Sequence, residues 1–293
     1  MKILLFSRPQ LKLTADDIER LFSLIEKYGF DYAINSEFAE VVKGISHYPI
    51  PAEKIYGHDI SCEEKDALVI CCGGDGTLLE AVHRLKNKSI PVTAINFGHL
   101  GFLTATTRDG LEEFFEDIAN ARMRIEPRTM LKVEGIRQAG HAVTALNEVA
   151  AHRLDATMLK VVTEVNGQIV TSFSGDGLIV ATPTGSTAYS LSAGGPIVAP
   201  ACACFLITPL APHNFGMRPV VVPDTAEIVL DISTRHGEAM LSIDNRTYRI
   251  SEGEKVTIRR AEESVLLALP HNISFYESLH SKMMWDADIR NRA

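Results

Sequence analysis

Ala67-Leu-Val-Ile-Cys-Cys-Gly-Gly-Asp-Gly-Thr77 passes from six apolar residues into a glycine-rich turn. A continuous apolar run of this length, ended by glycines, predicts a strand buried on both faces, which is typical of a parallel sheet. Over residues 77–85 apolar side chains recur at three- and four-residue spacing, so a helix is expected directly after the turn. The order of strand, glycine turn and helix predicts one βα unit of a parallel α/β sheet.

The flanking sequence repeats this alternation through about residue 122. Residues 3–6 and 92–95 are short apolar runs that are typical of strands. Helical spacing follows the first run, with Thr14 as N-cap and Gly29 as the stop, and it recurs over 111–121. We therefore predict an α/β N-terminal domain at 1–122, in which ligands bind where the chain leaves the carboxyl ends of the strands.

Beyond residue 122 the pattern changes to a succession of β-rich runs with almost no helical spacing. Asn166-Gly167 lies between two alternating runs and predicts a β-hairpin, because both residues of a type I′ turn need positive φ. A mostly antiparallel all-β domain is therefore predicted at 123–262. The last segment, 263–293, returns to mixed character, and we expect it to pack back toward the N-terminal domain.

The charge of the chain restricts its partners. Lys and Arg number 29 against 37 Asp and Glu, which gives a formal net charge of −8. This balance opposes the basic footprint of a nucleic-acid binder, so an anionic ligand would need positive potential that is local. Residues 177–212 carry no charged side chain, but prolines interrupt them. We expect them to be buried interior and site lining rather than a membrane span.

Cysteine and histidine usage points away from a tightly bound transition metal. The five cysteines lack the two-residue gaps of zinc knuckles, and the ten histidines show no H-x-x-x-H spacing. Reduced cysteines are typical of a cytoplasmic protein, and this is the location we expect. No residue is assigned as a metal ligand.

A candidate phosphate loop, made of Gly73, Gly74, Gly76 and Thr77, surrounds Asp75. Backbone N–H groups and the dipole of the following helix would face a bound anion there. The spacing is neither GxxxxGK[ST] nor GxGxxG, so neither standard nucleotide loop is present. A carboxylate at such a position repels phosphate unless it holds a metal ion or accepts a proton from an attacking hydroxyl. The alternative is that Asp75 only caps the helix.

A second group of polar residues lies in an apolar setting. Residues 174–196 are rich in Ser, Thr and Gly, which offer a small polar ligand many hydrogen bonds, although the same composition suits a loop and a tightly packed helix. Asp176 is harder to explain as structure alone, because a lone buried carboxylate needs a partner or a ligand. Asn147-Glu148 also lies among apolar residues, and its carboxylate could accept two ribose hydroxyls at once.

Several motifs occur in one order along the chain: Gly73-Gly-Asp-Gly-Thr77, residues 96–103, Asn147-Glu148, residues 174–196 and residues 212–220. Together they closely resemble the bacterial NAD kinase family from the first strand to Trp285, and the block Thr-Pro-Thr-Gly-Ser-Thr-Ala-Tyr at 182–189 is highly specific to it. The resemblance implies ATP-dependent phosphorylation of the 2′-hydroxyl of the adenosine ribose of NAD, giving NADP. It also implies Mg²⁺ as cofactor and a homodimer or homotetramer.

Two alternatives stay open at this point. The glycine loop alone is shared with diacylglycerol-type lipid kinases, although the hydroxyl-rich residues 182–192 argue against a wide apolar acceptor groove. A non-catalytic NAD-binding sensor would keep the pocket but have no need of Asp75 in the loop. Production of NADP from NAD and ATP separates the kinase from both.

The resemblance carries roles to individual positions. Asp75 matches the catalytic aspartate of the family, and Gly76 matches its ligand-contacting neighbour. Asn147 and Glu148 match the pair that holds NAD. The positions that line the dinucleotide site are matched by Thr187, Ala188, Tyr189 and Ser192. These residues are the predicted substrate site, and the resemblance thus implies that 123–262 is the NAD-binding domain.

Three further positions concern charge near the ligand. Asp176 matches the aspartate associated with the nicotinamide half, so its charge is expected to favour the cationic ring of NAD over the neutral ring of NADH. Ser174 stands where many bacterial members carry a basic residue. Arg246 departs from the Asp-x-Gln pattern of the family, and we include it in the predicted site as a source of the missing positive charge.

Overall fold

We describe the protein from a computed structural model, which covers residues 1–9, 13–46, 48–98, 101–214, 216–235 and 237–283. Two compact units divide the chain: Met1–Pro127 with Val265–Ala293, and Arg128–Ser264. Each unit has its own hydrophobic core. The first is an α/β unit and the second consists mainly of antiparallel strands, as the sequence predicts.

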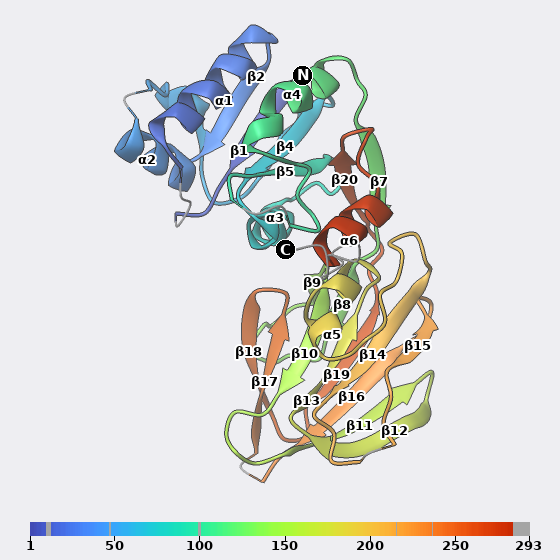
Figure 1. Cartoon of the computed structure of the whole chain (residues 1–293). Helices are drawn as coiled ribbons and strands as arrows, with labels where there is room; N and C mark the ends of the chain where they lie inside the picture. Colours follow the sequence, from blue (N-terminus) through green and yellow to red (C-terminus); the bar gives the residue numbers. More distant parts are fainter. Residues whose placement is uncertain (10–12, 47, 99–100, 215, 236, 284–293) are drawn as a thin grey trace, which may run out of the picture. The chain divides into compact units, whose positions relative to one another are not determined.

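The first unit is built on a sheet with the strand order β3-β2-β1-β4-β5-β20-β7, in which β6 also pairs with β5 (Figure 1). The pairs β1–β2, β1–β4 and β4–β5 are parallel, which confirms the predicted βα alternation. β4 lies between two neighbours, and all of its residues are buried. The strands are β1 (Lys2–Phe6), β2 (Asp31–Asn35), β3 (Ile55–Tyr56), β4 (Ala67–Cys72), β5 (Val92–Asn96), β6 (Thr106–Thr107), β7 (Arg124–Arg128) and β20 (Val265–Leu269).

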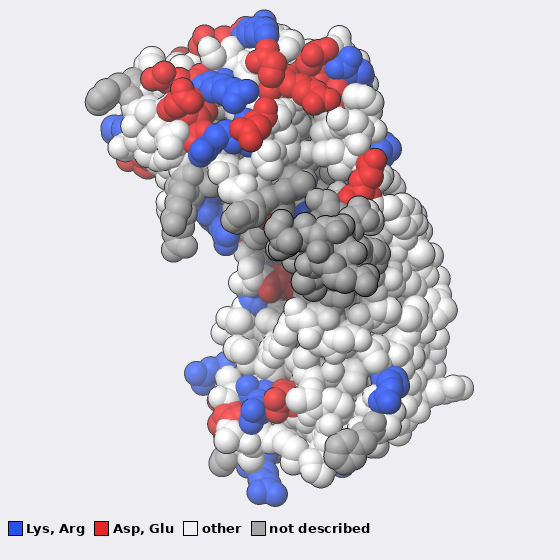
Figure 2. Space-filling model, viewed as in Figure 1, with Lys and Arg blue, Asp and Glu red and all other residues white. Residues whose placement is uncertain are grey.

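Amphipathic helices bury their apolar sides against this sheet. α1 (Ala15–Lys27) begins with a capping box, in which the Thr14 hydroxyl accepts the Asp17 N–H and the Asp17 carboxylate accepts the Thr14 N–H. α1 packs beside α4 (Leu111–Ala119), and both contribute side chains such as Phe22 and Phe115 to the core. α2 (Ser36–Ile45) lies against β2, and α3 (Asp75–Arg84) lies against β4 and β5. Acidic and basic side chains are interspersed over the outer helices (Figure 2).

The C-terminal segment returns to the first unit. β20 enters the sheet beside β5, where Leu267 pairs with Val92 in parallel, and β7 is its other neighbour. α6 (Phe275–Met283) follows, and the Arg124 guanidinium donates to the Ile273 carbonyl just before it, at 2.7 Å. This return allows residues that are remote in sequence to lie close to the glycine loop.

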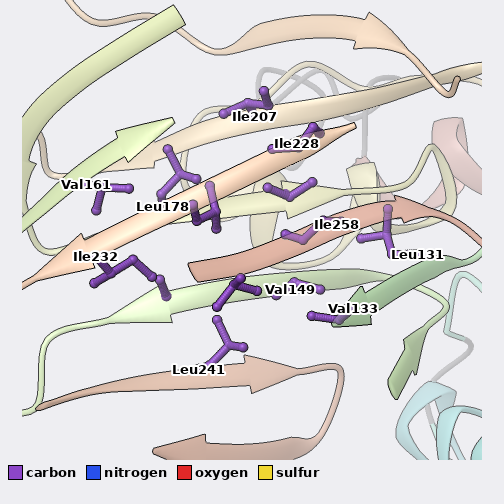
Figure 3. Packing of buried hydrophobic residues seen from close by; sticks show 14 of the residues in the cluster. Leu131, Val133, Val149, Val161, Leu178, Ile207, Ile228, Ile232, Leu241 and Ile258 are labelled. Atoms are coloured by element: carbon purple, nitrogen blue, oxygen red, sulfur yellow. The ribbon is translucent and has the colours of Figure 1, made fainter. Parts of the chain in front are cut away.

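The second unit is a sandwich of two six-stranded sheets, ordered β15-β14-β13-β10-β17-β18 and β12-β11-β16-β19-β8-β9. Alternate residues of both sheets point into one core, where Val149 and Leu241 of the first sheet join Val133 and Ile258 of the second (Figure 3). The strands of the first sheet are β15 (Val220–Pro223), β14 (Cys204–Leu210), β13 (Gly177–Ala181), β10 (Glu148–His152), β17 (Glu238–Ile243) and β18 (Arg246–Ser251). Those of the second are β12 (Gln168–Gly175), β11 (Leu159–Val165), β16 (Ile228–Ser233), β19 (Lys255–Arg260), β8 (Leu131–Glu134) and β9 (Val143–Ala145).

The strands of the uncharged stretch 177–212 fold as interior, as predicted, whereas several residues between them, such as Tyr189 and Cys202, are exposed. β13 is buried on both faces: Leu178 and Val180 join the core of the sandwich, while Ile179 and Ala181 join a smaller cluster that Ala193 helps to cover. Between β13 and β14 the chain forms a 3-10 turn, η3 (Thr184–Thr187), and a short helix, α5 (Tyr189–Ser192). Among the residues described, no helix is long and apolar enough to cross a membrane.

Local predictions can be compared with the structure at two turns. Asn166 and Gly167 have φ of 51° and 76° between β11 and β12, which confirms the predicted hairpin. α3 begins at Asp75 and not at Thr77, because Gly74 takes the N-cap position. The glycine loop is therefore shorter, and its aspartate belongs to the helix.

Candidate active site

The glycine loop connects the end of β4 to the first turn of α3. The Gly73 N–H still donates to the Ile95 carbonyl at 2.8 Å, and Gly74 is the N-cap, with no side-chain hydrogen bond to the helix. A Cβ on Gly73 would overlap the Thr77 side chain, and Gly73 has a φ of 149°. The first N–H groups of α3 lack partners within the helix, so this end of the strand offers donors and a positive dipole to an anion.

The Asp75 carboxylate holds a neighbouring loop and does not act as the cap of its own helix. Its Oδ2 accepts the Phe102 N–H at 2.8 Å, and its Oδ1 accepts the Leu103 N–H at 3.0 Å. Gly101 passes so close that a Cβ there would overlap Oδ1. The helix-cap alternative is therefore wrong, because Gly74 occupies the N-cap position and Asp75 is turned toward residues 101–103.

Two basic side chains lie beside the loop, and the sequence analysis missed both. A Cβ added to Gly76 would lie 3.2 Å from Nη2 of Arg8, which follows β1. Lys282 comes from α6, and its buried Nζ lies 4.2 Å from the centre of the Phe102 ring, without a hydrogen-bond partner in the described parts of the chain. Burial lowers the pKa of Lys282 to about 8, and the charge of Asp75 opposes this shift. Local positive charge thus stands near the loop despite the negative net charge.

In the second unit, Asp244 fixes the backbone of the Asn147-Glu148 pair. Its Oδ1 accepts the N–H groups of Asn147 at 2.9 Å and Glu148 at 3.2 Å, and its Oδ2 accepts the Leu146 N–H at 2.8 Å. The Asp244 N–H in turn donates to the Glu148 carbonyl at 3.0 Å. Asp244 sits in the turn between β17 and β18 with a φ of 50°. It is a positioning residue that the sequence analysis noted only as part of a departure from the family pattern.

Antiparallel pairing of β10 with β13 brings this pair to the Thr-rich turn. Glu148 is opposite Ala181, and the Thr182 N–H donates to the Asn147 carbonyl at 2.9 Å. Gly185 lies directly against the Asn147 backbone, so a Cβ on Gly185 would overlap the Asn147 carbonyl group. The structure therefore joins two motifs that are separated by more than thirty residues in the sequence.

Both side chains of the pair keep a buried oxygen without a partner among the described residues, namely Asn147 Oδ1 and Glu148 Oε2. Only 8% of Glu148 is exposed. Burial and, to a lesser extent, the charge of Asp244 raise the pKa of Glu148 to about 8, against a hydrogen bond from the Tyr189 N–H that lowers it. Buried acceptors that the protein leaves unsatisfied are typical of a site that awaits a donor from a ligand.

Most hydroxyls of the 182–190 block stabilise the fold and are not offered to a ligand. Thr182 donates to the Leu146 carbonyl at 2.6 Å, Ser186 to the Val198 carbonyl at 3.2 Å, and Ser190 shares a hydrogen bond with Thr208. Thr187, predicted to line the site, donates to the Thr184 carbonyl at 3.2 Å. The reading of this block as a set of ligand contacts is thus too broad.

Asp176 lies at the other end of the β10–β13 pair. His152 is opposite Gly177 there, and the Tyr189 ring stacks on His152 with ring centres 5.5 Å apart. A pocket of about 550 Å³ is lined by His152, Arg153, Asp176, Tyr189, Ser192, Ala193, Leu210 and Ala211. The four-residue step along β10 from Glu148 to His152 corresponds to about 13 Å. Tyr189 contacts both ends, so the predicted residues of this unit form one elongated surface.

Two family models match the chain, the N-terminal domain of ATP-NAD kinase over residues 23–123 and the C-terminal domain of ATP-NAD kinase over residues 146–269. A NAD kinase of Bacteroides fragilis is 37% identical over 99% of this chain and 100% of its own length. The chain belongs to the ATP-NAD kinase family. A NAD kinase of Flavobacterium psychrophilum is 34% identical, again over 99% of this chain and 100% of its own. As a member of this family, the chain is a kinase that transfers phosphate to NAD.

Solved structures show that the kinase fold extends over the chain. The yeast NADH kinase complexed with NADH has a TM-score of 0.84 and 22% identity, and the match covers 100% of this chain and 90% of that one. A NAD kinase from Archaeoglobus fulgidus in complex with ATP has a TM-score of 0.74 and 24% identity, with 97% and 99% covered. These neighbours support the α/β plus antiparallel β architecture of an ATP-NAD kinase.

Two positions depart from the family pattern, Ser174 and Arg246, and they lie in different surroundings in this kinase. Arg246 donates from Nη2 to the Thr144 carbonyl at 2.6 Å and lies close enough to Asp244 to oppose the rise of its pKa. It thereby supports the residue that holds Asn147 and Glu148, and its contact with a ligand stays a prediction. Ser174 lines a different pocket from Asp176. Residues 99 and 100 of one resemblance motif, residue 215 of another, and Trp285 lie outside the described residues.

Proposed function

We propose that Asp75 is the general base of the NAD kinase reaction and that Asn147 and Glu148 hold the adenosine ribose of NAD. The 2′-oxygen attacks the γ-phosphorus of ATP, the bond from this phosphorus to the β,γ-bridging oxygen breaks, and ADP leaves while Asp75 takes the hydroxyl proton. The observation that carries the substrate assignment is the pair of buried acceptors, Asn147 Oδ1 and Glu148 Oε2, for which ribose hydroxyls are suitable donors. Gly76, Thr187, Ala188, Tyr189 and Ser192 are proposed to line the substrate site.

Mg²⁺ fits this site best as a companion of ATP. Among the described residues there is no cluster of three or more His, Cys, Asp or Glu side chains that could hold a metal ion. Mg²⁺ commonly keeps several waters and binds through substrate phosphates with only one or two carboxylates. We therefore propose that it enters with the triphosphate, where it would offset phosphate charge next to the glycine loop.

One assay tests the proposed function directly. Purified protein is incubated with ATP, Mg²⁺ and NAD, and the product is analysed for a phosphate on the adenosine ribose. Formation of NADP phosphorylated at the 2′-position is the expected result. Phosphorylation of diacylglycerol in a parallel incubation would support the lipid kinase, and NAD binding without turnover would support the sensor.

Glu148→Gln is expected to weaken NAD binding and to stabilise the empty protein at alkaline pH. Gln replaces one carboxyl oxygen by an NH₂ group, which cannot accept a hydrogen bond, so KM for NAD should rise while KM for ATP changes little. Because the folded-state pKa of about 8 lies above the ordinary value of 4.5, stability contributed by protonated Glu148 is lost as the pH rises between these values. The slope is at most about 1.4 kcal/mol per pH unit.

Unfolding by denaturant from pH 5 to pH 9 measures this second effect. The difference in stability between Glu148→Gln and wild type should grow in favour of the variant up to about pH 8 and then level off. A difference that stays constant with pH would contradict the raised pKa. A rise of KM for ATP with no change for NAD would contradict the assignment of Glu148 to the dinucleotide.

Lys282→Met is expected to raise KM for ATP by about 10- to 100-fold, the range for a hydrogen bond to a charged group. The buried ammonium near Asp75 has no hydrogen-bond partner among the described residues, and we propose that it binds the donor phosphates. KM for NAD should change less. Lys65→Met, at an exposed position of the same unit, serves as the control. Equal KM values for ATP in wild type and Lys282→Met would remove Lys282 from the donor site.

A cytoplasmic location and a homodimeric or homotetrameric assembly complete the proposal. The assembly rests on the family resemblance. The location rests on the same resemblance and on the five cysteines, which are all free. Light scattering of the purified protein measures the assembly, and a monomeric mass across the working concentration range would refute it.

A further inference from the structure

Arg153 forms an ion pair with Asp176 in the elongated surface of the second unit. The Arg153 Nε lies 2.9 Å from Asp176 Oδ1. The two residues are also joined through the backbone, because the Arg153 N–H donates to the Asp176 carbonyl at 3.0 Å. Arg153 directly follows β10, and Asp176 directly precedes β13, so the pairing of these two strands keeps the side chains together. The sheet register thus places the two side chains next to each other.

The charges of this pair dominate the pocket of about 550 Å³. Arg153 and Asp176 both line it, and their side chains are 36% and 43% exposed, so a ligand in the pocket can reach either one. His152 is neutral near pH 7, because burial lowers its pKa, and its Nε2 is hydrogen-bonded to the Ser242 hydroxyl at 3.0 Å. The described lining residues therefore carry one positive and one negative charge, which largely cancel.

This cancellation changes what Asp176 can do. An unpaired carboxylate at this position would attract the cationic ring of NAD and leave the neutral ring of NADH unaffected. A guanidinium bound to the same carboxylate repels the cationic ring by a similar amount, because the two opposite charges lie within one ion-pair distance. The preference for NAD that Asp176 alone predicts is thus offset by a residue that the sequence analysis did not consider.

We propose that Arg153 is a specificity-determining residue that neutralises Asp176 and lets the nicotinamide pocket accept oxidised and reduced dinucleotide with similar affinity. The proposal rests on the placement of the nicotinamide half beside Asp176 under the proposed function. The wild-type protein is therefore expected to bind NAD and NADH with dissociation constants within about threefold of each other. Arg153 is thus expected to control the affinity for NAD relative to NADH, and not an affinity that both forms share.

A double-mutant cycle on the NADH-to-NAD ratio of dissociation constants tests the proposal. Arg153→Gln leaves Asp176 unpaired and should shift the ratio about tenfold in favour of NAD, which corresponds to about 1.4 kcal/mol. Asp176→Asn leaves Arg153 unpaired and should shift the ratio toward NADH. The double variant should return close to wild type. Arg153→Lys keeps the positive charge and is the matched control, with a ratio near the wild-type value.

Each outcome of the titrations supports or refutes the proposal. Ratios that stay unchanged in both single variants would overturn it. Equal weakening of NAD and NADH by Arg153→Gln would also overturn it, because Arg153 would then bind a part that both forms share, such as the pyrophosphate. The wild-type assay for NADP separates these results from failure of the proposed function: if NADP forms and the ratios do not move, only this inference is wrong. Melting temperatures of the variants show whether the second unit is folded, and the backbone bond from Arg153 to Asp176 does not depend on the altered side chains.

Discussion

Asp75→Asn is expected to lower kcat by about 10²- to 10⁴-fold, the usual contribution of a general base. The substitution keeps the shape of the side chain but removes the group that takes the proton of the 2′-hydroxyl. The surroundings of Asp75 add a second consequence. Its two oxygens accept the N–H groups of Phe102 and Leu103, and an amide can accept only one of them. The N–H group left without a partner costs about 1–3 kcal/mol, so the melting temperature should fall as well.

A second variant separates catalysis from the anchoring of residues 101–103. A Cβ on Gly101 would overlap Asp75 Oδ1, so Gly101→Ala disturbs the same contact but keeps a carboxylate that can still accept a proton. If Asp75 is the base, Gly101→Ala should retain far more of kcat than Asp75→Asn at a similar loss of stability. Equal losses of kcat in the two variants would reduce Asp75 to an anchor. Dissociation constants for ATP within about threefold of wild type would show that the loop is intact.

The sequence was sufficient for the parts of the fold that depend on local patterns. Thr14 followed by Asp17 predicts the start of α1, and Asn166-Gly167 predicts the hairpin, because in each case neighbouring residues supply the hydrogen bonds or the dihedral angles. The order of sheet strands was less accessible. β20 enters the first sheet beside β5 after a separation of more than 160 residues, and no local pattern encodes such a neighbour.

The same distinction applies to the site. Polar side chains within or next to apolar runs are uncommon, so the sequence alone singles out Asp75, Asn147 and Glu148. The residues that surround these three side chains or hold them in place do not stand out. Asp244 reaches the 146–148 backbone only through the turn between β17 and β18, and Lys282 reaches the glycine loop only because α6 belongs to the first unit. Such side chains look like ordinary charged residues until the tertiary structure places them.

The hydroxyl-rich block shows the opposite error. Thr182, Ser186 and Ser190 look like ligand contacts in the sequence, yet each of them is hydrogen-bonded within the protein. A tight turn and a short helix leave many backbone groups without regular partners, and small hydroxyl side chains satisfy them. Composition therefore could not separate the residues that build the turn from those that can face the pocket.

Gly185→Ala is expected to lower both the stability of the second unit and its affinity for NAD. A Cβ there would overlap the Asn147 carbonyl, and that backbone cannot move aside freely. The Thr182 N–H binds the same carbonyl, while Asp244 holds the N–H groups of Asn147 and Glu148. Overpacking of this kind costs about 1–3 kcal/mol in stability. Because the displaced residues are the proposed ribose contacts, KM for NAD should rise by at least about tenfold.

Comparison with Gly44→Ala distinguishes this contact from a general effect of replacing glycine. Gly44 lies in α2, where a Cβ meets nothing within 4 Å, so alanine should be neutral or slightly stabilising there. KM for ATP should stay close to wild type in Gly185→Ala, because the glycine loop belongs to the other unit. A Gly185→Ala protein with wild-type melting temperature and KM for NAD would mean that the Thr-rich turn does not hold Asn147 in place. In that case Asp244 alone would position the pair, and Asp244→Asn should then produce the rise in KM for NAD that Gly185→Ala does not.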